Sequence, residues 1–528
     1  MGEDGLERNV DLERLEYRKM TEEEVNMVQI PREEQNNEEC KKAKIVELEK
    51  LKSFDSFEEV DDKGQYRISC RWILWKKGSE VRARLVARGF EEAEEVPSDS
   101  PTVDKCNIRV ALAIAASKGW SIKCSDVKSA FLQGKELERL VTMTPPKEAQ
   151  VEKGKLWKLK VALYGLDDAS LQFFFKCKEE LLKLGCKQSS HDPALFFKMN
   201  LANELIGVIV LHVDDFLHAG NKIFEETVSD RLADVYTMGK VEEKKFTYVG
   251  FDIDQKEEGI TIDQSQYARE KITNITIDPE RAKNQDDELS SEEKSLLRVV
   301  AGRIGWLARG TRPDLTFAQI EMSTKFVNGK VRDLIEAVKA QRKAKSGECF
   351  LLIRGLGPVS GWRLEVWTDA SLFTLNEGVN STGAMLIMLV NEKGECVPIV
   401  WQANKIKRIV RSSLEAECLA LVEGLKEATF VRDVVEEVFG LKEKAIPVRA
   451  IIDNKSTVDA VHSTAAVSDK KLRRDIGIVK QMLNEGDVTS LAWCQGKDQL
   501  ADVMTKRTAS PFNLLSVFQK GRRHLTNF

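Results

Sequence analysis

The sequence predicts an α+β protein with several domains. Its 528 residues exceed what one hydrophobic core usually serves and suit about two or three domains. Apolar residues over 205–219, interrupted by two aspartates and followed by a polar turn, indicate a β-hairpin in the first half. In the last third, strand-like runs near 363–369, 382–390 and 446–453 alternate with a helical pattern from about 413 to 438. A sheet-containing region followed by a second α/β domain accounts for both patterns.

The elements before the hairpin follow from local pattern. We expect an acidic, disordered leader over residues 1–44, because this segment is polar, charged and weakly periodic. Ile45, Leu48 and Leu51 then recur at helical spacing, and a strand-rich stretch with two tryptophans precedes a basic segment at 81–90. The further expected elements are a helix at 107–118, an extended segment at 120–127 and an amphipathic helix at 170–185. Residues 279–295 are charged and predict a linker.

Composition excludes several classes of protein. The longest apolar run, at 205–211, is far shorter than the roughly 20 residues of a membrane span, and the acidic N-terminus lacks the apolar core of a signal peptide. The ten cysteines form neither a C-x-x-C motif nor a Cys/His cluster, so we expect reduced thiols and no zinc site. The net charge is −4, and the acidic leader masks a slightly basic body that permits phosphate contacts.

Two sets of acidic residues stand at the ends of predicted strands. Asp126 ends the extended segment 120–127, and Asp214 and Asp215 lie where an apolar strand gives way to a turn. Carboxylates from two such strands suit a pair of Mg²⁺ ions about 4 Å apart, the arrangement that serves nucleotidyl transfer. A Val-Asp-Asp sequence at a hairpin is also ordinary turn chemistry, so this set alone decides nothing.

The second set lies in the C-terminal third. Asp369 and Asp453 end strand-like runs, Glu417 borders the apolar stripe of the 413–438 helix, and Asp502 falls in a short helix-like segment. Four acids that converge at one end of a sheet repel one another unless cations neutralise them. Two Mg²⁺ ions would do so and would activate water for phosphodiester hydrolysis. The alternative for each acid is an exposed charge.

Short motifs in the first half resemble those of copia-type LTR retrotransposon reverse transcriptases. They are Arg82 to Phe90 (K-A-R-L-V-A-R-G-F in the family), Asp126 to Leu132 (D-V-K-S-A-F-L), Leu163 to Leu166 (L-Y-G-L), Asp192 to Phe196 (D-P-S-L-F), His212 to Asp215 (Y-V-D-D) and Thr311 to Asp314 (T-R-P-D). They occur in the family's order and spacing over roughly residues 45–325.

The last third resembles the RNase H region of the same Pol polyproteins. The matching motifs are Trp367 to Ser371, Trp401 to Lys405, Ser412 to Glu417 (S-S-x-E-A-E), Asp453 to Ser456 (D-N-Q-S) and Ala501 to Lys506 (A-D-I-L-T-K). We prefer Glu417 to Glu415 as the helix-borne acid, because it better fits the E-x-x-A helix of RNase H folds.

The resemblance implies a fingers–palm–thumb polymerase over residues 45–330, a connection over 331–362, an RNase H-like α/β domain over 363–510 and a C-terminal tail over 511–528. It implies two Mg²⁺ or Mn²⁺ ions in each active site. The implied metal ligands and catalytic residues are Asp126, Asp214 and Asp215 in the polymerase and Asp369, Glu417, Asp453 and Asp502 in the RNase H-like domain. Phe131 would exclude a 2′-hydroxyl, and Arg82, Arg84 and Arg88 are candidates to contact the incoming triphosphate, as alternatives to solvated strand residues.

Three departures from the family bear on activity. His212 replaces the tyrosine before V-D-D. Asp167 and Asp168 follow L-Y-G-L, where Asp168 replaces a glutamine expected near the nucleotide, and this acidic pair is expected to repel a triphosphate. Asp475 stands where the family has a histidine that helps product release, which predicts slower RNA cleavage.

The sequence therefore supports two hypotheses. The first is an RNA-directed DNA polymerase with ribonuclease H activity, acting on an RNA template, a DNA primer, an RNA–DNA hybrid and dNTPs. The second is a catalytically weak retroelement remnant that binds nucleic acid. We expect no membrane partner, other Pol or Gag products as candidate partners, and an intracellular location in a cytoplasmic virus-like particle or the nucleus. No protease or integrase motif is present in the 528 residues, which suit a processed product, a truncated gene or a decayed copy.

Overall fold

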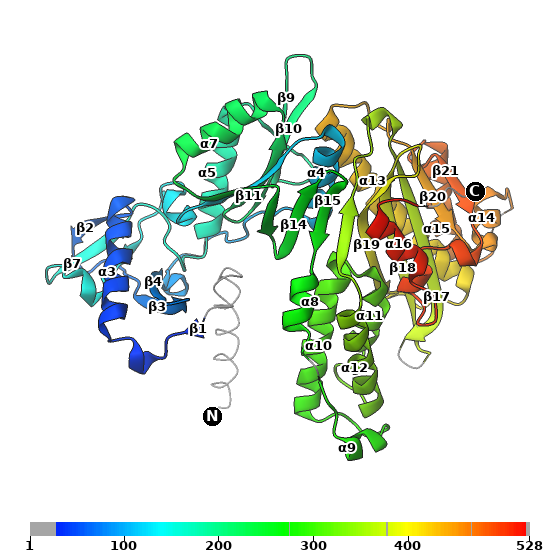
Figure 1. Cartoon of the computed structure of the whole chain (residues 1–528), viewed down its shortest axis with the longest axis horizontal. Coiled ribbons are helices and arrows are strands. Elements are labelled where there is room, and N and C mark those ends of the chain that lie inside the picture. Colours follow the sequence, from blue (N-terminus) through cyan, green and yellow to red (C-terminus); the bar gives the residue numbers. More distant parts are fainter. Residues whose placement is uncertain (1–27, 274, 376–377, 466, 524–528) are drawn as a thin grey trace.

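The structure is a computed structural model that describes residues 28–523 except 274, 376–377 and 466. Its four parts are a strand-rich N-terminal part, a central sheet, a helical bundle that projects from the sheet, and a C-terminal α/β part (Figure 1). They follow one another in the order expected for fingers, palm, thumb and RNase H-like domain. Among the described residues, no helix is long and apolar enough to cross a membrane.

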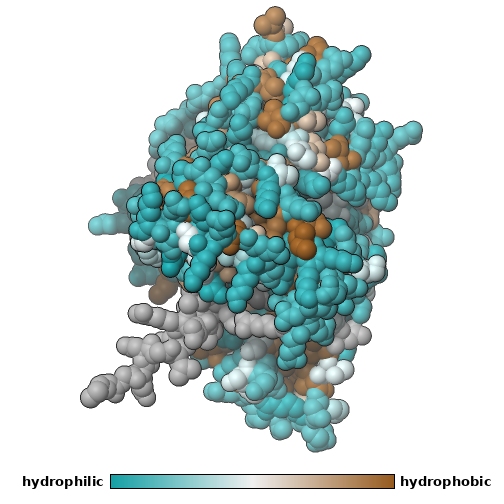
Figure 2. Space-filling model, turned by 90° about the vertical axis from the view of Figure 1, so that its left-hand side faces the viewer, coloured by the Kyte–Doolittle hydropathy of each residue, from teal (hydrophilic) through white to brown (hydrophobic). Residues whose placement is uncertain are grey.

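The N-terminal part, which we call the fingers, consists of two small sheets and one long helix. Its sheets have the strand orders β1-β3-β4 and β2-β7-β6. The elements are β1 (Val28–Gln29), η1 (Arg32–Glu34), α3 (Glu38–Ser53), β2 (Phe57–Asp61), β3 (Cys70–Lys77), β4 (Glu80–Ala87), η2 (Gly89–Glu91), β6 (Thr142–Met143), η4 (Lys147–Ala149) and β7 (Lys155–Leu159). The exposed face of this part is mostly polar, with apolar side chains scattered over it (Figure 2).

The predicted leader is wrong for residues 28–44. Residues 28 and 29 pair with β3, and α3 begins at Glu38, where the side chain of Asn37 caps it by accepting from the amide of Cys40 at 2.8 Å. Cys40, Leu48 and Leu51 of α3 are buried against the fingers strands, whereas Ile45 is exposed. The apolar face of α3 therefore outweighs the acidic composition from residue 38 onward. Residues 1–27 of the predicted leader lie outside the described part of the chain.

The central sheet, the palm, is antiparallel and has the order β12-β5-β11-β10-β9-β8. Its elements are α4 (Lys105–Lys118), β5 (Ile122–Val127), η3 (Ala130–Gln133), α5 (Ala169–Lys183), β8 (Lys187–Gln188), β9 (Leu195–Met199), β10 (Leu205–His212), β11 (Asp215–Gly220), α6 (Lys222–Phe224), η5 (Glu225–Ser229), α7 (Asp230–Val235) and β12 (Met238–Glu243). The predicted hairpin is confirmed as β10 and β11, which pair from Gly207–Gly220 to His212–Asp215. Nearly every residue of β10 is buried, as expected for a central strand.

A second antiparallel sheet joins the palm to the helical bundle. Its strands are β13 (Lys245–Tyr248), β14 (Phe251–Lys256), β15 (Gly259–Asp263) and β16 (Phe350–Ile353), in that order. The bundle, the thumb, contains α8 (Ser265–Lys271), α9 (Pro279–Lys283), α10 (Ser291–Gly310), η6 (Pro313–Leu315), α11 (Thr316–Ser323) and α12 (Val331–Ser346). Because β16 follows α12 and pairs with β15, the chain leaves the thumb through the sheet by which it entered.

Two predicted boundaries are corrected here. The linker at 279–295 contains α9 and the start of α10, whose capping box joins Ser290 and Glu293. The connection at 331–362 is not a separate unit, because α12 packs on α10 and β16 completes the second sheet.

The T-R-P-D motif holds the helical bundle of the thumb together. The buried Arg312 pairs with the buried Asp314 at 2.8 Å and donates to the carbonyls of Lys343 and Ala344 at the end of α12.

The C-terminal part has a five-stranded sheet in the order β19-β18-β17-β20-β21, in which β17, β20 and β21 run parallel. Its elements are η7 (Val359–Gly361), β17 (Arg363–Leu375), β18 (Asn380–Val390), β19 (Cys396–Lys405), α13 (Ser413–Phe439), β20 (Val448–Ile452), α14 (Lys455–His462), α15 (Lys470–Asn484), β21 (Ser490–Trp493), η8 (Gly496–Asp498), η9 (Asp502–Met504) and α16 (Phe512–Lys520). The predicted tail at 511–528 is wrong for residues 512–520, because α16 buries Leu514 and Phe518 against the sheet.

Candidate catalytic sites

The first acid set gathers at the end of the palm hairpin. Strands β5 and β11 are antiparallel neighbours, and Asp126 lies directly opposite Asp215 in their register. Asp214 occupies the turn between β10 and β11, and its carbonyl accepts from the amide of Val127 at 3.1 Å. All three acids line one large cleft of about 2210 Å³. The structure therefore brings Asp126, Asp214 and Asp215 together, as the strand-end pattern predicts.

The turn that carries Asp214 is strained. Val213 has a φ of 55°, in the left-handed region that a β-branched side chain strongly disfavours. Such backbone strain costs about 1–3 kcal/mol and persists only where the surrounding structure imposes it, often at functional sites. Here the two-residue turn between His212 and Asp215 imposes it, because hairpin turns of this length require a positive φ. Asp214, the second residue of this turn, lines the cleft.

Two basic side chains of the fingers line the same cleft as the acids. Arg82 and Arg84 of β4 both line it, and Arg84 lies 3.9 Å from the ring centre of Tyr164, a cation–π contact. Arg82 pairs with Glu80 at 2.9 Å. Arg88 is not among the lining residues and lies 3.5 Å from Glu91. Of the three predicted arginines, the structure therefore leaves Arg82 and Arg84 as candidates to meet a triphosphate.

Phe131 lies behind the cleft wall and contacts a lining residue. It belongs to η3, four residues beyond the end of β5, and its ring packs against that of Tyr164 at 4.9 Å between centres. Tyr164 itself lines the cleft and carries Arg84 on its face. Through Tyr164 the structure places Phe131 next to the cleft but not among the residues that line it.

Asp168 does not act as the sequence suggests. It is buried, with 2% of its surface exposed, and it accepts from Arg139 at 2.6 and 2.9 Å. Arg139 also pairs with Glu92 at 2.9 Å. Because Arg139 neutralises Asp168 and Asp168 does not line the cleft, the expected repulsion of a triphosphate is wrong for this member of the acidic pair. Asp168 instead joins the start of α5 to the loops that carry Glu92 and Arg139.

The second acid set forms a compact cluster in the C-terminal part. Carboxylate oxygens of Asp369, Glu417 and Asp453 all lie within 4.8 Å of one another. Asp369 comes from the middle of β17, Asp453 follows the end of β20, and Glu417 projects from the first turns of α13. The preferred acid of the S-S-x-E-A-E motif is thus in the cluster. Glu415 instead accepts from the amide of Arg411 and pairs with Arg408 at 3.2 Å.

Burial and mutual repulsion raise the pKa of these acids. Burial, together with the carboxylates of Asp369 and Asp453, raises the pKa of Glu417 to about 9. The pKa of Asp369 is raised to about 7, mainly by burial and against the lowering effect of Lys506. Burial also raises the pKa of Asp453. One carboxylate oxygen of Glu417, Oε2, is buried without a hydrogen-bond partner. Three converging carboxylates with an unsatisfied oxygen fit a hard divalent cation such as Mg²⁺.

Asp502 joins this cluster through a lysine that the sequence analysis did not single out. Lys506 pairs with Asp502 one helical turn before it and with Asp369 at 3.3 Å. Thr505 donates to the other oxygen of Asp369. The spacing of four residues between Asp502 and Lys506, typical of a helical ion pair, was the available signal.

Asp475, which stands in place of the family's histidine, is buried beside this site. It pairs with Arg408, which also reaches Glu415, two residues before Glu417. The charge of Asp475 is therefore neutralised by Arg408 within the fold. Local sequence pattern does not indicate this partner, because Arg408 lies 67 residues away.

The fold, with one acid set in the palm and one in the C-terminal part, defines a class, a right-hand polymerase fold joined to an RNase H-like domain. Residues 55–283 match the family described as reverse transcriptase (RNA-dependent DNA polymerase). The chain is related to the Pol polyproteins of copia-type retrotransposons. It is 25% identical over 466 residues to the retrovirus-related Pol polyprotein from transposon RE1 of Arabidopsis thaliana, covering 83% of this chain and 30% of that protein. It is 26% identical over 458 residues to the corresponding protein from transposon TNT 1-94 of Nicotiana tabacum, covering 79% of this chain and 33% of that protein.

The chain thus spans about a third of the length of these curated relatives. Among solved structures, the foamy viral protease–reverse transcriptase in complex with dsDNA has a TM-score of 0.52 at 14% identity, over 89% of this chain and 86% of that one. A second structure of this viral protein, designated dRH and also bound to dsDNA, has a TM-score of 0.53 at 13% identity, over 86% and 70%. These likenesses support the fold, which extends across polymerase and RNase H-like parts.

Proposed function

We propose that the chain is an RNA-directed DNA polymerase with ribonuclease H activity, working on an RNA template, a DNA primer, dNTPs and the RNA–DNA hybrid that results. The observation that carries the proposal is the placement of Asp126 opposite Asp215, with Asp214 in the strained turn, so that all three line one cleft. Arg82 and Arg84 lie in the same cleft and supply positive charge for a triphosphate.

In this proposal Asp126, Asp214 and Asp215 hold one pair of Mg²⁺ or Mn²⁺ ions, and Asp369, Glu417, Asp453 and Asp502 hold the other. Bound there, the metal ions would lower the pKa of the attacking hydroxyl or water and stabilise the leaving oxygen. The chain's own residues position these groups. The Val213 turn holds Asp214 in place, Arg82 and Arg84 orient the phosphates, and Thr505 holds Asp369 through its hydrogen bond.

Primer extension on poly(rA)–oligo(dT) with Mg²⁺ tests the polymerase. We expect template-dependent DNA synthesis by the full chain and a loss of at least about 100-fold in Asp214→Asn, because one metal ligand loses its charge. Cleavage of a labelled RNA–DNA hybrid tests the second site, with Asp453→Asn as the inactive variant. Each substitution should leave the other activity intact, which separates a lost site from a lost fold. Soluble, folded protein without either activity contradicts the proposal.

The alternative is a catalytically weak remnant that binds nucleic acid. His212 in the cleft and Asp475 beside the second acid set favour it, since both depart from the family. The buried Arg139–Asp168 pair weighs against it, because the departure at Asp168 is neutralised. Tight duplex binding without dNTP incorporation is the result that this alternative expects. An intracellular location, in a cytoplasmic virus-like particle or in the nucleus, is part of both proposals.

A further inference from the structure

Three consecutive residues connect the second acid set to the thumb. Thr505 and Lys506 bind Asp369, and Lys506 also binds Asp502. The next residue, Arg507, turns the other way and pairs with two glutamates of the thumb. It lies 2.6 Å from Glu321 in α11 and 2.8 Å from Glu336 in α12. A span of three residues therefore joins the acid cluster to two helices of another part of the molecule.

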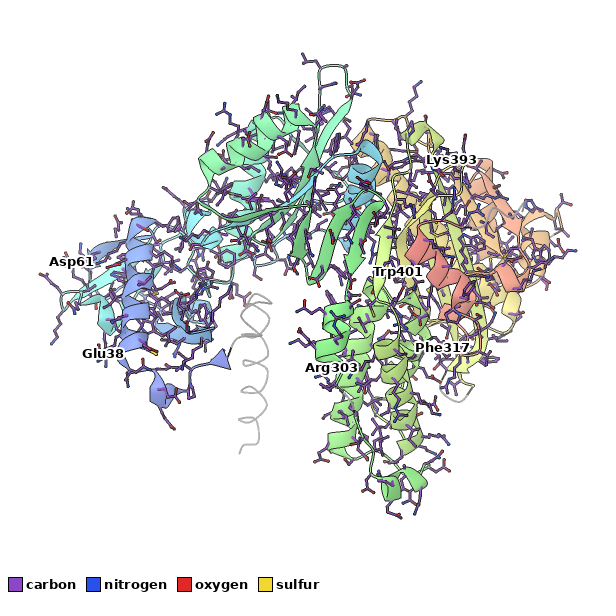
Figure 3. All side chains as sticks on the ribbon, in the orientation of Figure 1. Glu38, Asp61, Arg303, Phe317, Lys393 and Trp401 are labelled. Carbon is purple, nitrogen blue, oxygen red and sulfur yellow. The ribbon has the colours of Figure 1, made fainter. Side chains whose placement is uncertain are left out.

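Apolar packing reinforces this connection. Val503 and Met504 of η9 are buried, and they share one hydrophobic cluster with Phe317 and Ile320 of α11. Phe317 lies where the helical bundle meets the C-terminal part (Figure 3). The turn η6, which carries the T-R-P-D motif, also packs against η9. The segment that bears Asp502 thus rests on the thumb rather than on its own sheet alone.

The apolar contact between η9 and α11 and the ion pairs of Arg507 have separate roles. The apolar contact holds η9 against α11 whatever the charge state of its neighbours. The Arg507 ion pairs are half-exposed, so they contribute little to overall stability. The ion pairs act on position instead. Two carboxylates from two helices hold the guanidinium of Arg507 in one place, and this restrains the adjoining Lys506 and Thr505. Mutation of a group that supports a metal ligand typically lowers metal affinity or activity by about 10–100-fold.

We propose that Arg507 is a positioning residue for RNA cleavage, through which the thumb helices α11 and α12 hold Asp502 and Asp369 in their catalytic geometry. The inference rests on the proposed ribonuclease H function. Arg507 touches neither the acids nor, in this proposal, the hybrid. A thumb that is displaced from the C-terminal part would release the ion pairs and loosen the acid cluster, so RNA cleavage depends on the position of the thumb.

The test breaks the same ion pairs from both sides. Arg507→Ala removes the cation, and the double variant Glu321→Gln with Glu336→Gln removes the two acids, which lie in the thumb and far from the cluster in sequence. Lys426→Ala is the matched control, because it breaks an exposed ion pair with Glu423 within α13 of the same part. For each protein, hybrid-cleavage kcat and KM, primer extension, and hydrogen exchange of amides 501–507 are measured.

We expect kcat for cleavage to fall about tenfold in Arg507→Ala and in the double variant, with KM for the hybrid and primer extension unchanged. Combining all three substitutions should add no further loss, because one interaction is being removed. Exchange of amides 501–507 should accelerate in both, and Lys426→Ala should resemble the wild type. Arg507→Lys should recover part of the loss.

Two results would overturn the inference. In the first, Arg507→Ala loses activity while the thumb variant does not, which would mean that Arg507 acts on the hybrid directly. In the second, exchange of amides 501–507 is the same in all variants, which would mean that the thumb does not hold this segment. Exchange is measured whether or not the wild type cleaves RNA. If the wild-type protein does not cleave the hybrid, the proposed function is refuted. Hydrogen exchange of amides 501–507 still decides whether Arg507 holds this segment in place.

Discussion

Asp168 and Glu417 are both buried acids, yet their surroundings are opposite. Asp168 faces the guanidinium of Arg139, and its charge is compensated inside the fold. Glu417 faces two other carboxylates, and one of its oxygens has no partner. A compensated acid stabilises the fold, whereas an uncompensated group of acids requires an added cation. This contrast distinguishes a structural acid from a candidate metal ligand, and the identity of the residue does not.

Arg139→Ala should destabilise the protein by about 3 kcal/mol, because it leaves the buried Asp168 and the partly buried Glu92 without their cation. Chemical denaturation measures the loss. Arg231→Ala, which breaks an exposed pair with Asp234, should cost less than about 1 kcal/mol. Asp168→Asn should leave the KM for dNTPs unchanged. A fall in that KM would restore the interpretation of Asp168 as a group that repels the nucleotide.

Glu417 should make the metal-free protein less stable as the pH rises. Its pKa in the folded chain is about 9, far above that of an unfolded glutamate, so folding favours its protonated form. That stabilisation is complete below the unfolded pKa, near pH 4, and is lost progressively as the pH rises toward 9. Melting temperatures in EDTA should therefore fall between pH 6 and pH 9. Added Mg²⁺ should reduce the fall, because it binds the ionised acids. Glu417→Gln should flatten the metal-free curve, and an unchanged slope in this variant would contradict the assignment.

At the scale of the elements, the local sequence pattern predicted those features that depend on one strand or one helix alone. The apolar run of β10 and the turn after it predicted the palm hairpin, and the extended segment 120–127 predicted the position of Asp126 near a strand end. Strand β19 was missed, and Pro398 in it interrupts the usual signal. It pairs with Met388 at an irregularity of the ladder, on an edge strand where proline is tolerated.

Val213→Gly should raise the stability of the protein by about 1 kcal/mol, because glycine adopts a positive φ without the penalty that valine incurs. Thermal unfolding measures the change. Val241→Gly is the control, since Val241 is an exposed residue of β12 with an ordinary φ, where glycine should destabilise. Primer extension by Val213→Gly should not improve, because a freer turn holds Asp214 less firmly. Equal destabilisation by both substitutions would show that Val213 is not strained.

At the scale of the whole molecule, contacts between parts were beyond the reach of local pattern. Arg109 of α4 is buried in the palm, yet it lies 3.8 Å from the ring centre of Trp401 in β19 and donates to the carbonyls of Ile399 and Arg309. Trp401 donates in turn to the carbonyl of Ala308 in α10. Palm, thumb and C-terminal part thus meet at one arginine and one tryptophan, 292 residues apart in the printed sequence. An arginine in an apolar helix gave no indication of such a partner.

The contacts of Arg109 with β19 and α10 should make the palm and the C-terminal part unfold together. Arg109→Met supplies an apolar side chain of similar length, but it leaves the carbonyls of Ile399 and Arg309 without their donor and removes the cation–π contact. The free energy of unfolding should fall by about 2 kcal/mol or more. Calorimetry should show one main transition for the wild type and two separated transitions for the variant, the first at a lower temperature. Arg298→Met is the matched control, because Arg298 lies over Phe326 and donates to its carbonyl on the exposed surface of the thumb alone. If Arg109→Met melts in a single transition at the wild-type temperature, the parts are held together elsewhere, and β16 with α16 becomes the contact to test.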